Sequence, residues 1–178
     1  MEDKELIEIK ILRRLRSFIF GIKPKSALLT SMFIIHLVGS FIFFLWHSIS
    51  YFVIKNHEFI GKVKNVTVKN LIEKRGEELG YTFDLFSKNL ILFHFISITL
   101  WLTVFILGFF LYHKKRYSFF ISLSFIIAYH LVIITFFGIP YYKEDTTTFD
   151  KISILVIIVN SILFYLQNNK KEEDTIFT

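Results

Sequence analysis

Long apolar stretches alternate along this chain with short segments rich in charged residues. After Pro24, no Lys, Arg, Asp or Glu occurs between Ala27 and Ile54. Because an α-helix rises 1.5 Å per residue, about 20 apolar residues are enough to cross the hydrocarbon of a bilayer. The run therefore predicts a membrane-spanning helix over residues 27–54, and not a helix buried in a soluble core.

Three further stretches have the same character. Lys151 opens the last of them, whose apolar part is short for a full crossing, so we expect it to recruit Thr146–Phe149 with Lys151 reaching outward. The four predicted spans are residues 27–54, 89–112, 117–139 and 151–167. Two cytoplasmic segments are expected at the ends, a leader over 1–26 and a tail over 168–178. The predicted connections are an outer loop with a short helix over 55–88, a cytoplasmic loop over 113–116 and an outer loop over 140–150. This pattern predicts an all-α, polytopic membrane protein with four transmembrane helices.

The leader itself is amphipathic. An apolar row recurs at helical spacing, and two further apolar residues widen it, while polar and basic residues occupy the other side of the helix. The row is Ile7, Ile11, Leu15 and Phe18, and Leu12 and Ile19 widen it. The basic residues expected to contact a membrane surface or a partner are Lys10, Arg13, Arg14 and Arg16. Two interpretations stay open: a helix lying in the membrane interface, or one packed on the bundle or a cytoplasmic partner. The next apolar run is about twice as long as a signal-peptide core, so we expect the first span to remain in the mature protein.

The short basic loop between the second and third spans predicts the orientation. It consists of His113, Lys114, Lys115 and Arg116, and tyrosines flank it on both sides. Short loops rich in Lys and Arg stay in the cytoplasm, so both termini are expected inside, at the inner membrane of a bacterium. The loop over 55–88 is a counter-signal, because it also carries several Lys and Arg residues; its acidic residues count for little in this rule.

That longer outer loop is expected to hold a short helix. Thr67 can cap it and Gly80 is placed to end it, with Leu71 and Ile72 on its apolar side. Such a helix serves either as a recognition surface or as an amphipathic connector resting on the membrane.

Histidines are the only readily ionisable side chains inside the predicted spans, namely His36, His47, His94 and His130. Polar groups in hydrocarbon are costly and often functional. His36 and His47 lie eleven residues apart, about three turns, and so share one face of the first span. His47 and His94 should lie at one depth, which would allow haem or metal ligation. We favour instead hydrogen bonding between helices, and we expect no cofactor.

The polar and small residues of the spans offer contacts between helices. Small side chains that let helices approach closely are Gly39 and Ser40 on the first span and Ser124, Ala128 and Thr135 on the third. Asn160, in the middle of the fourth span, is the best candidate for a buried polar contact. We predict from it a homo-oligomer. No charged residue lies well within a span and no catalytic motif occurs, so the chain is not expected to be an enzyme.

Composition narrows the possible partners. Hydrophobic residues make up 53% of the 178 residues, above the 45–50% usual for soluble domains. The net charge of +6 is spread over several short segments without a nucleic-acid-binding motif, so it indicates lipid headgroups and topology, and no nucleic acid. The absence of Cys excludes disulfides and thiolate metal sites.

The architecture is similar to two known kinds of protein. Immunity proteins against the larger class of pore-forming colicins have comparable size, four spans, cytoplasmic termini and a long first outer loop, and membrane subunits of bacterial antiphage defence systems can look alike. We therefore predict a non-enzymatic inner-membrane protein that recognises partners, as a sensor or scaffold subunit whose leader contacts a cytoplasmic protein. The alternatives are an immunity-type protein and a haem- or metal-binding redox subunit.

Overall fold

The computed structural model describes residues 2–21, 26–58, 67–113 and 117–176, except the side chains of residues 2–8 and 168–176. These described residues form six helices and no strand. The helices are α1 (Glu2–Phe20), α2 (Ala27–Lys55), α3 (Val68–Glu78), α4 (Phe83–Tyr112), α5 (Tyr117–Glu144) and α6 (Thr148–Ile176).

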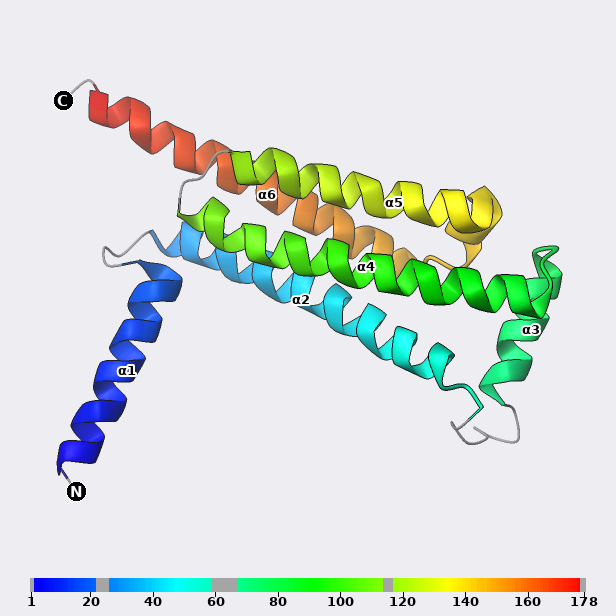
Figure 1. Ribbon diagram of the computed structural model, residues 1–178. Coiled ribbons are helices and arrows are strands. Elements are labelled where there is room, and N and C mark those ends of the chain that lie inside the picture. Colours follow the sequence, from blue (N-terminus) through cyan, green and yellow to red (C-terminus); the bar gives the residue numbers. More distant parts are fainter. Residues whose placement is uncertain (1, 22–25, 59–66, 114–116, 177–178) are drawn as a thin grey trace.

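Four long helices run antiparallel in a bundle, with α4 packed against α2 and α5, and α6 beside α2 (Figure 1). One end of the bundle, called here the α1 end, holds the start of α2 and the end of α4. The opposite end, called the α3 end, holds α3 and the connection from α5 to α6. Consecutive apolar helices joined by short connections pack as antiparallel neighbours, so the order of spans produces this arrangement.

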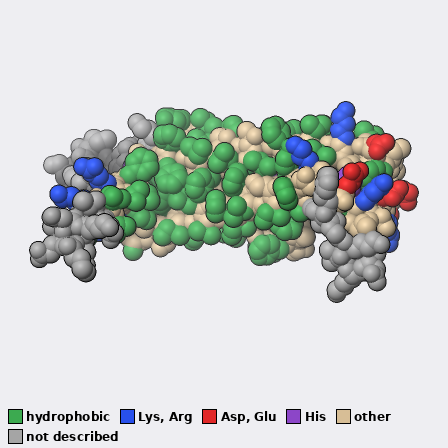
Figure 2. All heavy atoms as spheres, turned by 60° about the horizontal axis from the view of Figure 1, so that its bottom comes forward, with side chains coloured by type: hydrophobic (Ala, Val, Ile, Leu, Met, Phe, Trp, Pro, Cys, Tyr) green, Lys and Arg blue, Asp and Glu red, His purple; other side chains and the backbone are tan. Residues whose placement is uncertain are grey.

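The surface of the bundle is apolar between its two ends. In Figure 2 hydrophobic side chains cover the middle of the molecule, and the charged side chains gather toward the ends. Of the described helices, α2, α4, α5 and α6 are long and apolar enough to cross a membrane. A soluble protein of this size does not expose so continuous an apolar band. The protein is thus an all-α, multi-pass membrane protein with four transmembrane helices and an additional N-terminal amphipathic helix, as the sequence predicts.

Aromatic side chains fill the space between the helices. In the middle of the bundle the rings of Phe43 and Trp101 stack with centroids 4.5 Å apart, and Tyr129 packs edge-on against Trp101. Near the α1 end a second cluster forms around Phe33, which stacks on Tyr112 at 4.2 Å. Because lipid provides no hydrophobic drive between helices, such close packing is a main source of their association.

Polar caps fix the helix ends at the α3 end. The Thr67 hydroxyl accepts a hydrogen bond from the backbone N–H of Asn70, and Gly80 (φ 80°) ends α3 in a left-handed conformation, so both predictions are confirmed. Thr147 and Asp150 form reciprocal capping contacts at the start of α6. The helices exceed the predicted spans at several ends: α4 starts at Phe83, where Thr82 caps it, and α6 continues to Ile176, into the predicted tail.

A kink divides α5 near the α3 end. Gly138 has φ 80° and ψ 176°, and Pro140 lies within the same helix. Proline has no N–H, so the carbonyl of Phe136 loses its usual partner four residues ahead. The amide of Asn89 and the hydroxyl of Tyr81 each donate to this carbonyl, both at 3.4 Å. The predicted end of the third span at residue 139 therefore marks a kink, after which one more helical turn reaches Glu144.

The amphipathic helix α1 lies beside the start of α2 and projects away from the bundle, in a direction that crosses that of the four long helices (Figure 1). Gly21 follows it with φ 78°, a left-handed conformation that suits glycine, and its N–H bonds the carbonyl of Ser17. Among the described side chains of α1, those of the last turn pack on the bundle: Ile19 lies against the cluster around Phe33, and the ring of Phe20 lies edge-on to Phe33 and Tyr112.

Candidate functional site: buried histidines and an exposed amphipathic helix

Two histidines form a buried pair in the half of the bundle nearer α3. Nδ1 of His47 on α2 lies 2.9 Å from Nδ1 of His94 on α4, and both side chains are buried. The expectation that they share one depth is confirmed. When both rings are neutral, one Nδ1 carries the hydrogen and the other accepts it, so the two rings hold opposite tautomers. Nε2 of His47 is buried without a hydrogen-bond partner among the described residues.

The spacing of this pair does not suit haem. A metal–imidazole bond is about 2.0–2.1 Å, so two imidazoles on opposite sides of an iron need nitrogens about 4 Å apart. The two nitrogens at 2.9 Å bond each other directly instead. Among the described residues, moreover, no group of three or more His, Cys, Asp or Glu side chains is placed to hold a metal ion. The pair can share a hydrogen and join two helices.

A second polar centre surrounds His36, in the half nearer α1. Its Nε2 lies 3.2 Å from the carbonyl of Val104 on α4, and its Nδ1 lies 3.1 Å from the hydroxyl of Ser161 on α6. A carbonyl only accepts, so Nε2 carries the hydrogen and Nδ1 is the acceptor of the neutral ring. The Ser161 hydroxyl also lies 2.7 Å from the carbonyl of Ile157, and its single hydrogen serves one acceptor at a time. His36 thus joins three helices.

A glycine makes room for this histidine. A Cβ on Gly108 would lie 2.6 Å from Cδ2 of His36, closer than side-chain atoms normally approach. The imidazole therefore rests directly on the backbone of α4. His130, by contrast, meets neither centre. It is partly buried on α5, where its ring contacts Tyr129 and Tyr142 and its Nδ1 has no partner within the described part of the chain.

Asn160 forms its polar contact with another helix of the same molecule. Its amide donates a 2.7 Å hydrogen bond to the carbonyl of Met32 on α2, and the side chain is buried. The hydrogen-bond acceptor of this amide is therefore a neighbouring helix of the same chain, and not a second copy of the protein. The homo-oligomer stays a prediction, but Asn160 no longer supports it.

The small residues chosen on the third span do not face the bundle. Ser124 and Thr135 are exposed and Ala128 is only partly buried, while the buried face of α5 carries Ser122 and Ile126 instead. Ser124 and Thr135 therefore do not bring helices together within one chain, because all sides of this span are apolar and the pattern does not distinguish them. Contact between copies through this face stays a prediction. On α2, Gly39 lies against Ile157 of α6, and the Ser40 hydroxyl is buried and donates to the carbonyl of His36.

The apolar side of α1 is exposed. Phe18 is 75% exposed, and the rest of the row is open as well: Ile9, Ile11, Leu12 and Leu15. The basic residues of the described part, Lys10, Arg13, Arg14 and Arg16, are also exposed. From Ile9 to Phe18, the described side chains of α1 before its last turn, this surface is exposed. The loop residues Lys114, Lys115 and Arg116, expected at the same end, lie outside the described residues.

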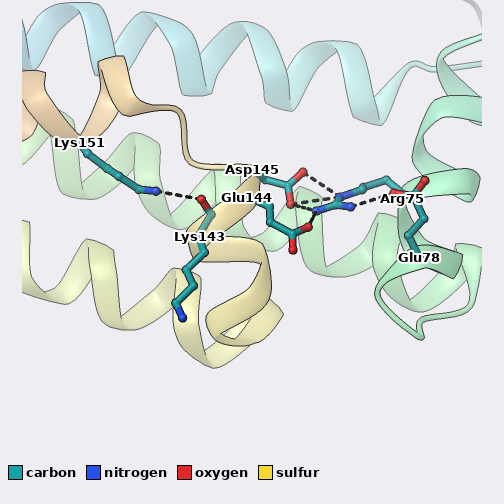
Figure 3. Close-up of polar contacts among 6 residues, drawn as sticks. All are labelled: Arg75, Glu78, Lys143, Glu144, Asp145 and Lys151. Carbon is teal, nitrogen blue, oxygen red and sulfur yellow. Dashed lines mark hydrogen bonds and ion pairs between the residues drawn. The ribbon is translucent and has the colours of Figure 1, made fainter.

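A charged cluster fastens the α3 end (Figure 3). The guanidinium of Arg75 on α3 donates to both carboxylate oxygens of Asp145, with its Nε at 2.9 Å and 3.1 Å, and to Glu144 at 2.9 Å. Glu78 adds a contact within α3 at 2.8 Å. The hydrogen bonds to Asp145, then those to Glu144 and Glu78, raise the pKa of the guanidinium further above its ordinary value, so the cluster keeps its positive centre.

The sequence does not reveal three of these features: the Ser161 contact, the Gly108 platform and the Arg75 cluster. A glycine opposite a histidine on another span is a visible signal, but pairing the two requires knowing the helix rotations. Arg75 looks like one charge among many in a mixed-charge loop.

Comparisons with known proteins supply no relative. No protein-family model, no curated protein and no solved structure matches this chain.

Proposed function

We propose that the protein is a non-enzymatic membrane subunit that recognises a protein partner, with α1 as its recognition element at the cytoplasmic face of a bacterial inner membrane. The observation that carries the proposal is the exposed apolar row on α1 from Ile9 to Phe18, whereas among the described side chains of this helix those of the last turn pack on the bundle. An apolar row beside basic residues fits an amphipathic or acidic surface on a partner.

The bundle supports this role as a rigid holder. Polar contacts connect α2 to α4 and α6 at several depths, through His36, His47 and Asn160. A sensor or scaffold needs such a fixed base, from which one element projects. The described surface of α1 consists of an apolar row and basic side chains, which suits binding to another surface.

Photo-crosslinking in cells tests the recognition role. A photoreactive phenylalanine at position 18 should yield a discrete protein adduct, and Leu15→Asp should abolish it by placing a charge in the apolar row. The matched control is the same probe at Phe120, an exposed ring near the same end of the bundle on α5, which should give lipid adducts only. Lipid adducts alone at position 18 would contradict partner recognition and leave α1 as a membrane anchor.

Reporter fusions test the proposed orientation. Alkaline phosphatase folds only outside the cytoplasm, so fusions after Asn65 should be active and those after Lys115 or Lys171 inactive. Activity after Lys115 would reverse the orientation and place α1 outside the cell.

A further inference from the structure

An apolar groove opens on the surface between α2 and α6, toward the α3 end. Its volume is about 680 Å³. The walls are Ile34, Val38, Ile42 and Trp46 on α2, and Phe149 and Val156 on α6. Along α6 and the capping residue before it, the groove extends from Ile157 to Thr147, which is about 15 Å at 1.5 Å per residue. That length equals about one leaflet, half of a hydrocarbon layer about 30 Å thick.

The walls suit a flexible chain better than a second helix. Helices in membranes associate through small residues that bring their backbones close. In this groove the small residues are Gly39 and Ser153, and the side chain of Ile157 already covers Gly39. The remaining walls are bulky branched and aromatic side chains. An acyl chain can follow such a surface by changing its own torsions, whereas a helix cannot approach it closely.

At the α3 end, the two helices that form the walls are each bonded to a different neighbouring element. On one side, the His47–His94 hydrogen bond fixes α2 to α4. On the other, Lys151 at the start of α6 donates to the carbonyl of Lys143, while Arg75 binds the preceding Asp145 (Figure 3). Neither set of contacts draws α6 toward α2 at this end, so the groove exists before any ligand enters.

The mouth of the groove carries a negative charge. Asp150 and Thr147 line its polar end, and Asp150 forms no ion pair among the described residues. Asp150 caps α6 through Oδ2, where Thr147 donates to it. The neighbouring Lys151 points its ammonium toward the carbonyl of Lys143 and the ring of Tyr142 instead. A carboxylate without a cation at the headgroup level attracts an ammonium group and repels an anionic headgroup.

We propose that this groove binds one acyl chain of an amine-headed phospholipid from the leaflet at the α3 end, with the lipid's ammonium group at Asp150. The site is independent of α1 and of its partner.

Native mass spectrometry tests the site. The full chain is extracted in mild detergent from vesicles of equal parts phosphatidylethanolamine and phosphatidylglycerol. The wild type should retain one phosphatidylethanolamine per chain. Ser153→Phe fills the groove and should lose this lipid, while Ser124→Phe, which adds the same ring on the exposed side of α5, should keep it. Equal retention by both variants, or a second copy of the chain in place of lipid, would overturn the proposal.

A second variant tests the headgroup contact. Asp150→Asn keeps an oxygen for the cap but removes the charge, so the retained lipid should lose its preference for phosphatidylethanolamine. An unchanged preference would remove Asp150 from the site.

Fluorescence tests the same site without a substitution among the residues that line the groove. In a Trp101→Phe protein, Trp46 is the sole tryptophan, because the chain has two. A small fraction of bromine-labelled phosphatidylethanolamine should quench Trp46 more strongly than the same fraction of labelled phosphatidylglycerol. Equal quenching by both lipids would indicate ordinary surrounding lipid and contradict a specific site.

Discussion

The two buried histidine centres differ in how completely their polar atoms are used. Around His36 both ring nitrogens meet partners, on α4 and α6, and the imidazole rests on Gly108. In the His47–His94 pair the rings chiefly serve each other, and Nε2 of His47 has no partner among the described residues. Histidine thus connects three helices in one half of the membrane and two helices in the other.

The difference shows where the bundle can tolerate change. A buried polar group with all its partners stabilises a single arrangement, because each alternative leaves a group unpaired in hydrocarbon. A pair that satisfies mainly itself can be removed together at little cost. We therefore expect the α1 half to be sensitive to substitution and the core of the α3 half to be tolerant.

The largest effect is expected at Gly108. Gly108→Ala places a Cβ against the His36 ring and should lower the free energy of unfolding by about 2 kcal/mol, despite the better helix propensity of Ala. The comparison variant is Gly39→Ala, where the new Cβ would lie 2.9 Å from Cγ1 and Cδ1 of Ile157. It should cost less than Gly108→Ala, because Ile157 borders the groove and can shift into it, whereas the His36 ring lies between helices. Unfolding in mixed detergent micelles measures both. Equal losses would show that His36 is not held against α4.

A smaller loss is expected at Asn160. Asn160→Leu removes the hydrogen bond to the Met32 carbonyl and should lower stability by about 1 kcal/mol. The mass of the protein in detergent should not change, since the contact lies within one chain. A shift of the mutant toward monomer would show that Asn160 also joins copies of the chain.

Removal of Arg75 should loosen the α3 end from outside the membrane. Arg75→Gln leaves Asp145 and Glu144 without their cation, and exposed ion pairs contribute about 1 kcal/mol or less. Amide hydrogen exchange in α3 should quicken, and high salt should produce part of the same effect in the wild type through screening. Lys74→Gln, at the exposed neighbouring position, is the control and should leave the exchange of α3 unchanged.

The smallest effect is expected from replacing the histidine pair as a unit. His47→Leu alone should cost about 1 kcal/mol, because His94 loses its partner. His47→Leu combined with His94→Leu should return close to wild-type stability, so the double-mutant cycle reports their coupling. A double mutant as unstable as the sum of the two single mutants would show that each ring has a further buried role.

The sequence was sufficient for the helices and their order, because uncharged runs and Thr or Gly caps are local signals. It also placed His47 level with His94, since depth follows from counting along antiparallel spans. The rotation of each helix about its own axis could not be predicted from the sequence. Ser124 and Thr135 lie outside and Ser122 lies inside, yet all three are small polar residues among apolar neighbours. In a membrane both faces of a helix are apolar, so the pattern that reveals the buried face of a soluble helix is absent.

Pro140 makes α5 depend on residues near the start of α4 for the hydrogen bonds of one carbonyl. The Phe136 carbonyl, which loses its helical partner to this proline, would cost several kcal/mol in hydrocarbon if nothing donated to it. Its donors, Tyr81 and Asn89, belong to residues synthesised earlier, at the start of α4 and just before it. When α5 enters the membrane, α4 is therefore already present with the group that α5 lacks. The α4–α5 hairpin can close at its α3 end before α6 arrives, and α6 then joins a finished pair.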